Sequence, residues 1–312
     1  MLIGHGEVLT HKKYGEHYHS LTIVAPHIGE KVRPGQFVNV KCGDNRDYIL
    51  RRPFSVYRVH KRGGWASTIE IVFDIRGPGT KYLSGLRTHA SVDLVGPLGR
   101  GFALPKRRAH CLLVGGGIGA VPLFLLADEL RDEGHRVDVI LGARSAGQLL
   151  NHIEARRLAS VCRITTEDGS QGDLGRVTDV LAETIERCES EVVYSCGPHP
   201  MLAAVSAVCV EQKVHVQVAV EELMACGFGV CMTCVMALRR PTRRNQSGQT
   251  EDEIVYARSC TEGPVFNGAS IMWDGAVEPV ATDQSELTPA GAPSRHGGLF
   301  DLEDQHVAPP GN

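Results

Sequence analysis

Hydrophobic positions in the first third of the chain come in short runs rather than in helical periods. Most of these runs are rich in β-branched residues, and glycine or proline separates one from the next. Evenly spaced short strands with such turns are typical of a small closed β-barrel. We therefore expect an antiparallel β-barrel over residues 1–103, with strands at residues 20–25, 36–41, 54–59, 68–74 and 90–95.

The pattern changes after residue 104, where apolar runs alternate with stretches of helical period. Such alternation is typical of an α/β domain with a parallel sheet covered on both faces. Ligands of these sheets bind at the carboxyl ends of the strands. We assign residues 104–220 to this domain, with strands at 110–114, 136–141, 161–165, 191–196 and 215–220 and helices at 121–133, 177–188 and 201–212.

Residues 221–275 show little periodicity but contain many glycines and three closely spaced cysteines. A segment this short has a marginal core of its own, and a bound metal would stabilise it. From 276 to 312 polar residues, proline and glycine dominate, which predicts a disordered tail. The sequence therefore predicts a multi-domain protein with a β-barrel, an α/β parallel-sheet domain and a small C-terminal metal-binding domain.

Composition narrows the classes of function. The formal net charge of −3 creates no field that would attract nucleic acid or an anionic membrane. No apolar run approaches the ~18 residues of a membrane span, and the first residues lack the apolar stretch of a signal peptide. We therefore expect a cytoplasmic protein. In a cytoplasmic protein we expect its ten cysteines to be metal ligands, catalytic thiols or small buried residues rather than members of disulfide bonds.

Three cysteines, Cys226, Cys231 and Cys234, have the Cys-x4-Cys-x2-Cys spacing of plant-type 2Fe–2S proteins. Cys260 follows as the candidate fourth ligand. Two glycines between the first two cysteines would let the loop wrap closely and aim backbone N–H groups at the sulfurs. Zinc, which binds cysteine pairs two to four residues apart, is one alternative, and simple buried thiols are another. The spacing favours a 2Fe–2S cluster.

Two motifs of the barrel suit a flavin dinucleotide. In Arg52-Pro53-Phe54-Ser55 the guanidinium would neutralise a pyrophosphate, and the hydroxyl would hydrogen-bond the flavin ring. Gly79-Thr80 lies where a short helix is expected to begin, and the first N–H groups of a helix attract anions. The alternatives are an exposed arginine and a threonine helix cap. The glycine-rich stretch 96–101 is interpreted only as the exit from the barrel.

A run of glycines lies directly between the first strand and the first helix of the α/β domain. Glycines in this position let the backbone approach a pyrophosphate at the start of the helix. The run does not complete the Gly-x-Gly-x-x-Gly fingerprint, so a purely structural turn is the alternative. The candidate nucleotide-binding residues are Gly115, Gly116, Gly117 and Gly119.

A second strand-to-helix junction, Cys196-Gly197-Pro198, is expected at the same edge of the sheet. Its thiol would pack beside a nicotinamide ring, although a buried core cysteine is the alternative. Arg144 ends the second strand of the sheet, where the adenosine ribose of a dinucleotide would lie. Arg144 could meet a 2′-phosphate there, which leaves NADH and NADPH both open.

In this order the motifs resemble those of the ferredoxin–NADP reductase superfamily. Segments 221–234 and 260–266 are similar, more narrowly, to the electron-transfer subunits of NAD-dependent dihydroorotate dehydrogenases. The resemblance implies that Cys226, Cys231, Cys234 and Cys260 hold the cluster. It also implies contacts to FAD from Arg52, Pro53, Phe54, Ser55, Val72, Phe73, Asp74, Gly79 and Thr80.

The function implied by the resemblance is electron transfer from NAD(H) through FAD and the 2Fe–2S cluster. The acceptor would be FMN in a catalytic partner subunit that oxidises dihydroorotate in pyrimidine biosynthesis, within a heterotetramer of two copies of each subunit. The basic insert 239–245 and the tail depart from the family pattern. They leave open sulfide dehydrogenase, transhydrogenase or hydrogenase complexes, and a zinc-stapled nucleotide-sensing module is the non-enzyme alternative.

Overall fold

The computed structural model describes residues 2–15, 17–43, 49–62, 65–241 and 252–273. The tail that the sequence predicts to be disordered, 276–312, lies outside the described residues, and so do residues 242–245 of the basic insert. Within the described residues no helix is long and apolar enough to cross a membrane.

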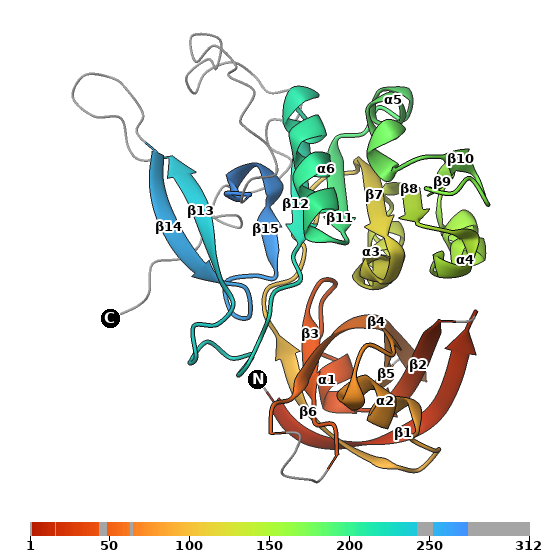
Figure 1. Ribbon diagram of the computed structural model, residues 1–312, viewed down its shortest axis with the longest axis vertical. Helices are drawn as coiled ribbons and strands as arrows, with labels where there is room; N and C mark the ends of the chain where they lie inside the picture. The colour runs from red at the N-terminus through yellow and green to blue at the C-terminus, as the bar shows by residue number, and fades with distance from the viewer. Residues whose placement is uncertain (1, 16, 44–48, 63–64, 242–251, 274–312) are drawn as a thin grey trace.

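The N-terminal residues form a closed antiparallel barrel, which confirms the predicted architecture (Figure 1). Every second residue of a strand points into the barrel, and apolar side chains at these positions form its core. Leu21 and Ile23 of one strand, for example, pair with Ile71 and Ile69 of the next, and all four are fully buried. The strand order is β1-β2-β5-β4-β3-β6. The bounds are β1 Leu2–Tyr14, β2 Tyr18–Val24, β3 Phe37–Val40, β4 Arg52–Arg62, β5 Trp65–Asp74 and β6 Ser91–Leu98, with short helices α1 Pro26–Gly29 and α2 Pro78–Ser84.

The hydrophobic pattern does not predict β1, because histidines and lysines interrupt its sequence. This strand is held instead by pairing with β2 on one side and β6 on the other, which closes the barrel. Tertiary pairing therefore overrides the weak local preference of the strand.

The α/β domain has a parallel sheet, in the order β10-β9-β8-β7-β11-β12, as the alternation of strands and helices predicts. The chain enters at β7, builds one side through β10, and then returns to add β11 and β12 on the other side. Ligands of doubly wound sheets bind at such a reversal. The bounds are β7 His110–Gly116, β8 Arg136–Ala143, β9 Cys162–Thr166, β10 Asp173–Leu174, β11 Val192–Cys196 and β12 His215–Ala219.

Helices cover both faces of this sheet (Figure 1). Helices α3 and α4 share a hydrophobic core with one face and with barrel residues such as Tyr57, whose ring lies 5.1 Å from that of Phe124. Helices α5 and α6 pack on the opposite face. The bounds are α3 Val121–Asp132, α4 His152–Leu158, α5 Leu181–Arg187 and α6 His199–Glu211, with 3-10 turns at Gly117–Ala120, Ala146–Gln148, Val177–Asp179 and Gly268–Ser270.

The cysteine-rich segment is not packed as a separate body. It forms a hairpin, β13 Val235–Pro241 with β14 Asp252–Arg258, and a short strand β15 Val265–Asn267 that extends the α/β sheet antiparallel to β12. Leu238 and Phe266 lie in the same hydrophobic core as α6. The segment therefore shares a core with the α/β domain, whereas the sequence suggests only a marginal core of its own.

The barrel exit also holds this segment. The N–H of Arg100 donates to the carbonyl of Gly263, and Arg100 forms a β-bridge with Pro264. Gly99 has a φ of +74°, and a Cβ there would lie 2.6 Å from Pro264. The stretch 96–101 is thus more than an exit from the barrel, because it fixes the loop that follows Cys260.

Candidate functional site

A cavity of about 870 Å³ opens between the barrel, the start of α3 and the segment after β12. We call it the flavin-side cavity. All nine residues that the sequence assigns to FAD lie along its wall: Arg52, Pro53, Phe54, Ser55, Val72, Phe73, Asp74, Gly79 and Thr80. The structure thus brings together the start of β4 and the start of α2, which are separated in the sequence by the rest of β4 and by β5.

Local chemistry explains the shape of this wall. Arg52 is the first residue of β4. Its guanidinium is exposed to solvent at the cavity and donates a hydrogen bond to the carbonyl of Leu50 at 2.9 Å. Gly79 lies against Arg52 and Cys42. The Thr80 hydroxyl accepts hydrogen bonds from the N–H groups of Arg76 and Gly77 at 2.9 and 3.2 Å. Thr80 is therefore not the N-cap, which is Gly77, but the third residue of α2, and its hydroxyl satisfies the N–H of that N-cap as well as lining the cavity.

A second cavity, of about 680 Å³, lies at the carboxyl ends of β7, β8, β9 and β11. We call it the nicotinamide-side cavity. Six residues that the sequence assigns to the nucleotide line it: Gly116, Gly117, Gly119, Arg144, Gly197 and Pro198. Two do not. Gly115 packs under the loop, where a Cβ would lie 2.7 Å from the Cβ of Ala120, and Cys196 lines the flavin-side cavity instead.

Glycines allow the two strand-to-helix junctions to touch. A Cβ on Gly119 would lie 2.4 Å from the Cα of Gly197, so backbone meets backbone at this point. A Cβ on Gly116 would meet the flexible end of Met201 at 2.5 Å. Gly117 has a φ of +53°. The glycine run therefore has a packing role at Gly115 and Gly119 as well as an open wall for a ligand.

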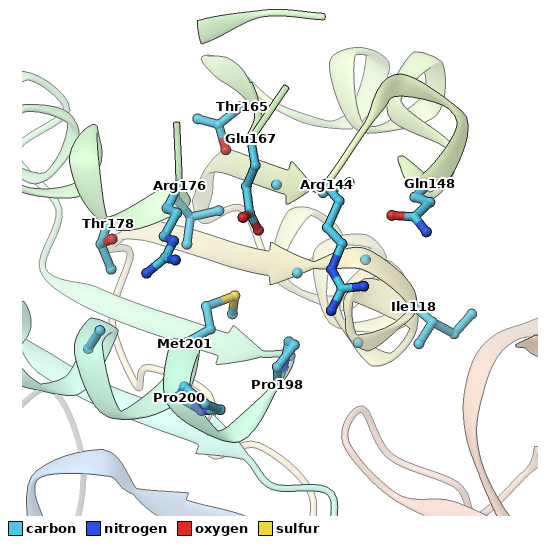
Figure 2. A pocket seen from close by; sticks show the side chains of 18 of the residues that line it. Ile118, Arg144, Gln148, Thr165, Glu167, Arg176, Thr178, Pro198, Pro200 and Met201 are labelled. Carbon is cyan, nitrogen blue, oxygen red and sulfur yellow. The ribbon is translucent and has the colours of Figure 1, made fainter. Parts of the chain in front are cut away.

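The sequence analysis predicts Arg144 in the nicotinamide-side cavity but misses the charged residues Glu167 and Arg176. Figure 2 shows Arg144, Glu167 and Arg176 directed toward the same space. Glu167 directly follows β9, so its place at a carboxyl strand end is the signal that could have identified it. Arginine side chains can neutralise phosphates, while a carboxylate can accept hydrogen bonds from a ribose and repels a further phosphate.

The two cavities meet at a common wall. Asp74, Arg76, Ile118, Gly119 and Glu221 line both of them. A flavin ring on one side and a nicotinamide on the other would therefore approach each other here, as hydride transfer requires. Glu221 follows β12 and is a residue that the sequence reasoning missed.

The Cys196 thiol lies beside this junction. Burial, with a further contribution from Glu221, raises the pKa of Cys196 to about 12. The thiol is therefore neutral at physiological pH, which suits packing against a ring rather than nucleophilic attack.

The β13–β14 hairpin brings Cys234 and Cys260, two of the candidate cluster ligands, together. Cys234 directly precedes β13 and Cys260 follows β14, while Val235 pairs with Arg258 across the hairpin. The N–H of Ser259 donates to the carbonyl of Cys234 at 2.8 Å. The long gap in sequence before Cys260 is thus closed by an ordinary antiparallel pair.

The four thiols form two pairs. Cys226 interacts with Cys231, and Cys234 interacts with Cys260. Among the described residues, no three His, Cys, Asp or Glu side chains converge on a point suited to one metal ion. Zinc would need four ligands around a single ion, whereas a 2Fe–2S cluster takes two thiolates on each iron. The two pairs are compatible with two thiolates on each iron of such a cluster.

The first pair is set up to carry negative charge. The N–H groups of Val230 and Cys231 point at Cys226 Sγ at 3.3 and 3.4 Å. Burial favours the neutral thiol of Cys226, but these and other loop N–H groups outweigh it and lower its pKa. The Thr233 hydroxyl and further N–H groups lower the pKa of Cys231 to about 6.

The second pair is buried. Cys234 and Cys260 are 2% and 1% exposed, and they pack with Phe37, which also lines the flavin-side cavity. Burial, followed by the neighbouring Cys234, raises the pKa of Cys260 to about 12. The buried pair thus borders the flavin side, and Cys231 of the first pair is exposed to solvent.

Known proteins are similar to this chain in sequence. Residues 221–272 match the iron–sulfur cluster binding domain of dihydroorotate dehydrogenase B. Two relatives named "Dihydroorotate dehydrogenase B (NAD(+)), electron transfer subunit" are similar over most of their length. The protein from Desulforamulus reducens is 35% identical over 250 residues, covering 80% of this chain and 90% of the relative. That from Shouchella clausii is 38% identical over 236 residues, covering 75% and 84%.

Solved structures agree with the fold. A chain of the NADH-dependent reduced ferredoxin–NADP oxidoreductase, described for flavin-based electron bifurcation, superposes with a TM-score of 0.71 and 27% identity over 86% of this chain and 90% of that one. A ferredoxin NADP+ reductase from Neisseria gonorrhoeae, with bound FAD and NADP, has a TM-score of 0.56 at 17% identity over 67% and 91%. The relatives and the cluster segment together identify this chain as a member of the dihydroorotate dehydrogenase B electron transfer subunit family.

Proposed function

We propose that this chain takes reducing equivalents from NADH and delivers them singly to the FMN of a dihydroorotate dehydrogenase catalytic subunit. The complex would be a heterotetramer with two copies of each subunit, acting in pyrimidine biosynthesis in the cytoplasm. The observation that carries the proposal is the order of the sites: the nicotinamide-side cavity adjoins the flavin-side cavity, which borders the buried cysteine pair, and the exposed pair follows.

Residues of the chain fit the groups that this function needs. Bound FAD would accept two electrons together and release them one at a time, and a 2Fe–2S cluster would carry them singly. Arg52 would neutralise the FAD pyrophosphate, and Ser55, at the cavity wall, would hydrogen-bond the flavin ring. The four cysteines would ligate the cluster, with Cys226 and Cys231 on one iron and Cys234 and Cys260 on the other.

The nicotinamide-side cavity favours NADH over NADPH. Arg144 and Arg176 would bind the phosphates that both cofactors share. The carboxylate of Glu167 would accept a hydrogen bond from a ribose hydroxyl, and it would repel the extra phosphate of NADPH. Glu167 thus supports NADH, where Arg144 alone leaves both cofactors open.

The cluster loop offers a surface for the partner. Around the exposed cysteine, Phe228, Val230 and Met232 are 48%, 73% and 54% exposed, and Leu223 nearby is 84% exposed. Large apolar side chains gathered on a surface mark an interaction site. We propose that the catalytic subunit covers these four residues, so that its FMN lies close to the exposed pair of ligands.

Stopped-flow absorbance under anaerobic conditions tests the proposal. NADH should bleach the flavin of the isolated chain, whereas dihydroorotate should bleach it only after the catalytic subunit is added. Copurification from the source organism should recover that subunit. Rapid flavin reduction by dihydroorotate in the isolated chain would contradict the proposal, and so would a lack of reduction by NADH and NADPH alike.

The similarity to the NADH-dependent reduced ferredoxin–NADP oxidoreductase favours one further candidate, a reductase subunit of a transhydrogenase-type complex. Such a chain would keep the same cofactors and the same exposed cysteine. Its partner would accept electrons from the cluster without oxidising dihydroorotate. The copurified partner therefore separates the two functions.

A further inference from the structure

Asn39 occupies a buried position between the flavin-side cavity and the cluster loop. It lies in β3 and is 1% exposed. On one side of the strand it pairs with Pro53, a residue of the flavin-side cavity, and on the other with Val95, which packs with Cys234 and Cys260. A polar amide at such a position needs an explanation, because burial is unfavourable unless its donor and its acceptor both find partners.

The nitrogen and the oxygen of this amide differ in their partners. Asn39 Nδ2 donates to the carbonyl oxygen of Cys226 at 3.1 Å. Its Oδ1 is buried and accepts no hydrogen bond from the described residues. An aliphatic side chain of similar size would avoid that unpaired acceptor, so core packing does not account for an asparagine here. The contact with Cys226 does.

The loop is shaped to accept this contact. Gly227, the next residue, has a φ of +79°, and a Cβ there would lie 2.0 Å from Asn39 Nδ2. The loop therefore comes close enough to Asn39 only because residue 227 is a glycine. Beyond it, the N–H groups of Val230 and Cys231 point at Cys226 Sγ. Asn39 thus holds the start of the turn whose N–H groups surround the first ligand.

We propose that Asn39 is a positioning residue for the cluster, which holds the Cys226 carbonyl so that the loop N–H groups stay aimed at the Cys226 sulfur. Hydrogen bonds to ligand sulfurs stabilise the more negative, reduced state and help to set the reduction potential. Loss of the contact lowers the potential and slows electron transfer from flavin to cluster, while flavin reduction by NADH is unchanged. The inference rests on the proposed function in one respect, that Cys226 is a cluster ligand.

The test is Asn39→Leu in the full-length, isolated chain. This substitution removes the donor to the Cys226 carbonyl, keeps the approximate size and also removes the unpaired Oδ1. Thr22→Val is the matched control, because the buried Thr22 hydroxyl accepts a hydrogen bond from Thr10 within the barrel, away from the cluster loop. We expect Asn39→Leu to release iron to a chelator about tenfold faster, with a shifted reduced-state EPR spectrum and a lower cluster midpoint potential. NADH should reduce the flavin of Asn39→Leu at the wild-type rate, and Thr22→Val should match the wild type in all four measurements.

Wild-type iron release, EPR spectrum and potential in Asn39→Leu would overturn the inference. Equal changes in Thr22→Val would overturn it as well, because they would reflect the barrel in general. If Asn39→Leu does not accumulate as a flavoprotein, Asn39→Ser, whose hydroxyl is too short to reach Cys226, is measured by the same criteria. A wild-type chain that binds no iron would instead contradict the proposed function itself, so the two failures are distinguishable.

Discussion

The nicotinamide-side cavity and the cluster loop reach their shapes by different means. The cavity is bounded by the ends of buried parallel strands, and at Gly119 and Gly197 one junction touches the other backbone to backbone. The cluster loop has exposed apolar side chains, and it is held by one hairpin and by Asn39 of the barrel. The sheet therefore sets the nucleotide site before a ligand binds, whereas the loop depends on a few contacts and on its metal.

The largest expected effect follows from removing one ligand of the loop. Cys260→Ser should abolish the cluster, because the buried pair then lacks a thiolate, while FAD content and flavin reduction by NADH stay within about twofold of wild type. Cys209→Ser is the control, since Cys209 is buried in α6 away from the cluster, and it should cost only about 1 kcal/mol of stability. Iron and sulfide analysis with EPR measures both. Normal iron in Cys260→Ser would mean that another residue is the fourth ligand.

The rigid region should respond to an added methyl group. Gly119→Ala should weaken NADH binding by about tenfold to a hundredfold, because its Cβ would collide with backbone at Gly197 and overpacking costs about 1–3 kcal/mol. Gly116→Ala should cost less than about threefold, since the flexible Met201 can move away. Titration of NADH against each variant gives the two dissociation constants. Equal effects would show that backbone contact does not set this site.

Arg52 tests the flavin-side cavity between the two regions. Arg52→Ala should weaken FAD binding by about 1.5–3 kcal/mol through loss of a charge-assisted phosphate contact. The cluster should remain. Arg51→Ala is the control, because Arg51 pairs with Asp93 at 2.7 Å and does not line the cavity. Flavin retention through gel filtration measures the difference, and equal retention in both variants would show that Arg52 makes no phosphate contact.

Glu167→Gln should shift cofactor preference within the rigid region. Removing the charge relieves repulsion of the 2′-phosphate, so the ratio of kcat/KM for NADH over NADPH should fall by about tenfold, or about 1.4 kcal/mol. Asp168→Asn is the control, because Asp168 accepts a hydrogen bond from the Ser170 hydroxyl at 2.6 Å and does not line the cavity. An unchanged ratio in Glu167→Gln would contradict the assignment of this carboxylate to the ribose.

The same contrast explains what the sequence could predict. The core strands of the sheet, the glycine junctions and the cysteine spacing are local patterns in the sequence. The strands predicted at 110–114 and 215–220, for example, agree closely with the observed β7 and β12. Strand β15 was not expected, because three residues carry no period of their own and depend on pairing with β12. Short or polar strands gain their stability from tertiary pairing rather than from local sequence.

The candidate site divides in the same way. Motif residues such as Arg52 and Cys226 can be recognised because the residues next to them in the sequence complete a known motif. Glu221 and Asn39 cannot, since each is a single polar residue whose role depends on elements brought together by folding. Only the three-dimensional structure shows that Cys196 faces the flavin-side cavity rather than the nicotinamide-side one.

The smallest expected effect concerns the pH dependence of two thiols, one at the junction between β11 and α6 and one in the cluster loop. Burial, together with Glu221, raises the pKa of Cys196 to about 12. A group with a raised pKa keeps its proton as pH rises until that value, so Cys196 stays neutral from pH 7 to 9. Thr233 and loop N–H groups instead lower the pKa of Cys231 to about 6, and this thiol is largely ionised over the same range.

The rate of flavin reduction at saturating NADH should therefore show no inflection from Cys196 between pH 7 and 9. Assembly of the cluster on cluster-free protein should, in contrast, slow as pH falls through about 6, because Cys231 must be a thiolate to bind iron. Stopped-flow absorbance and the rate of cluster reconstitution measure the two processes. An inflection between pH 7 and 9 that is present in the wild type and absent in Cys196→Ser would show that this thiol ionises, and the buried, rigid description of the junction would then be wrong.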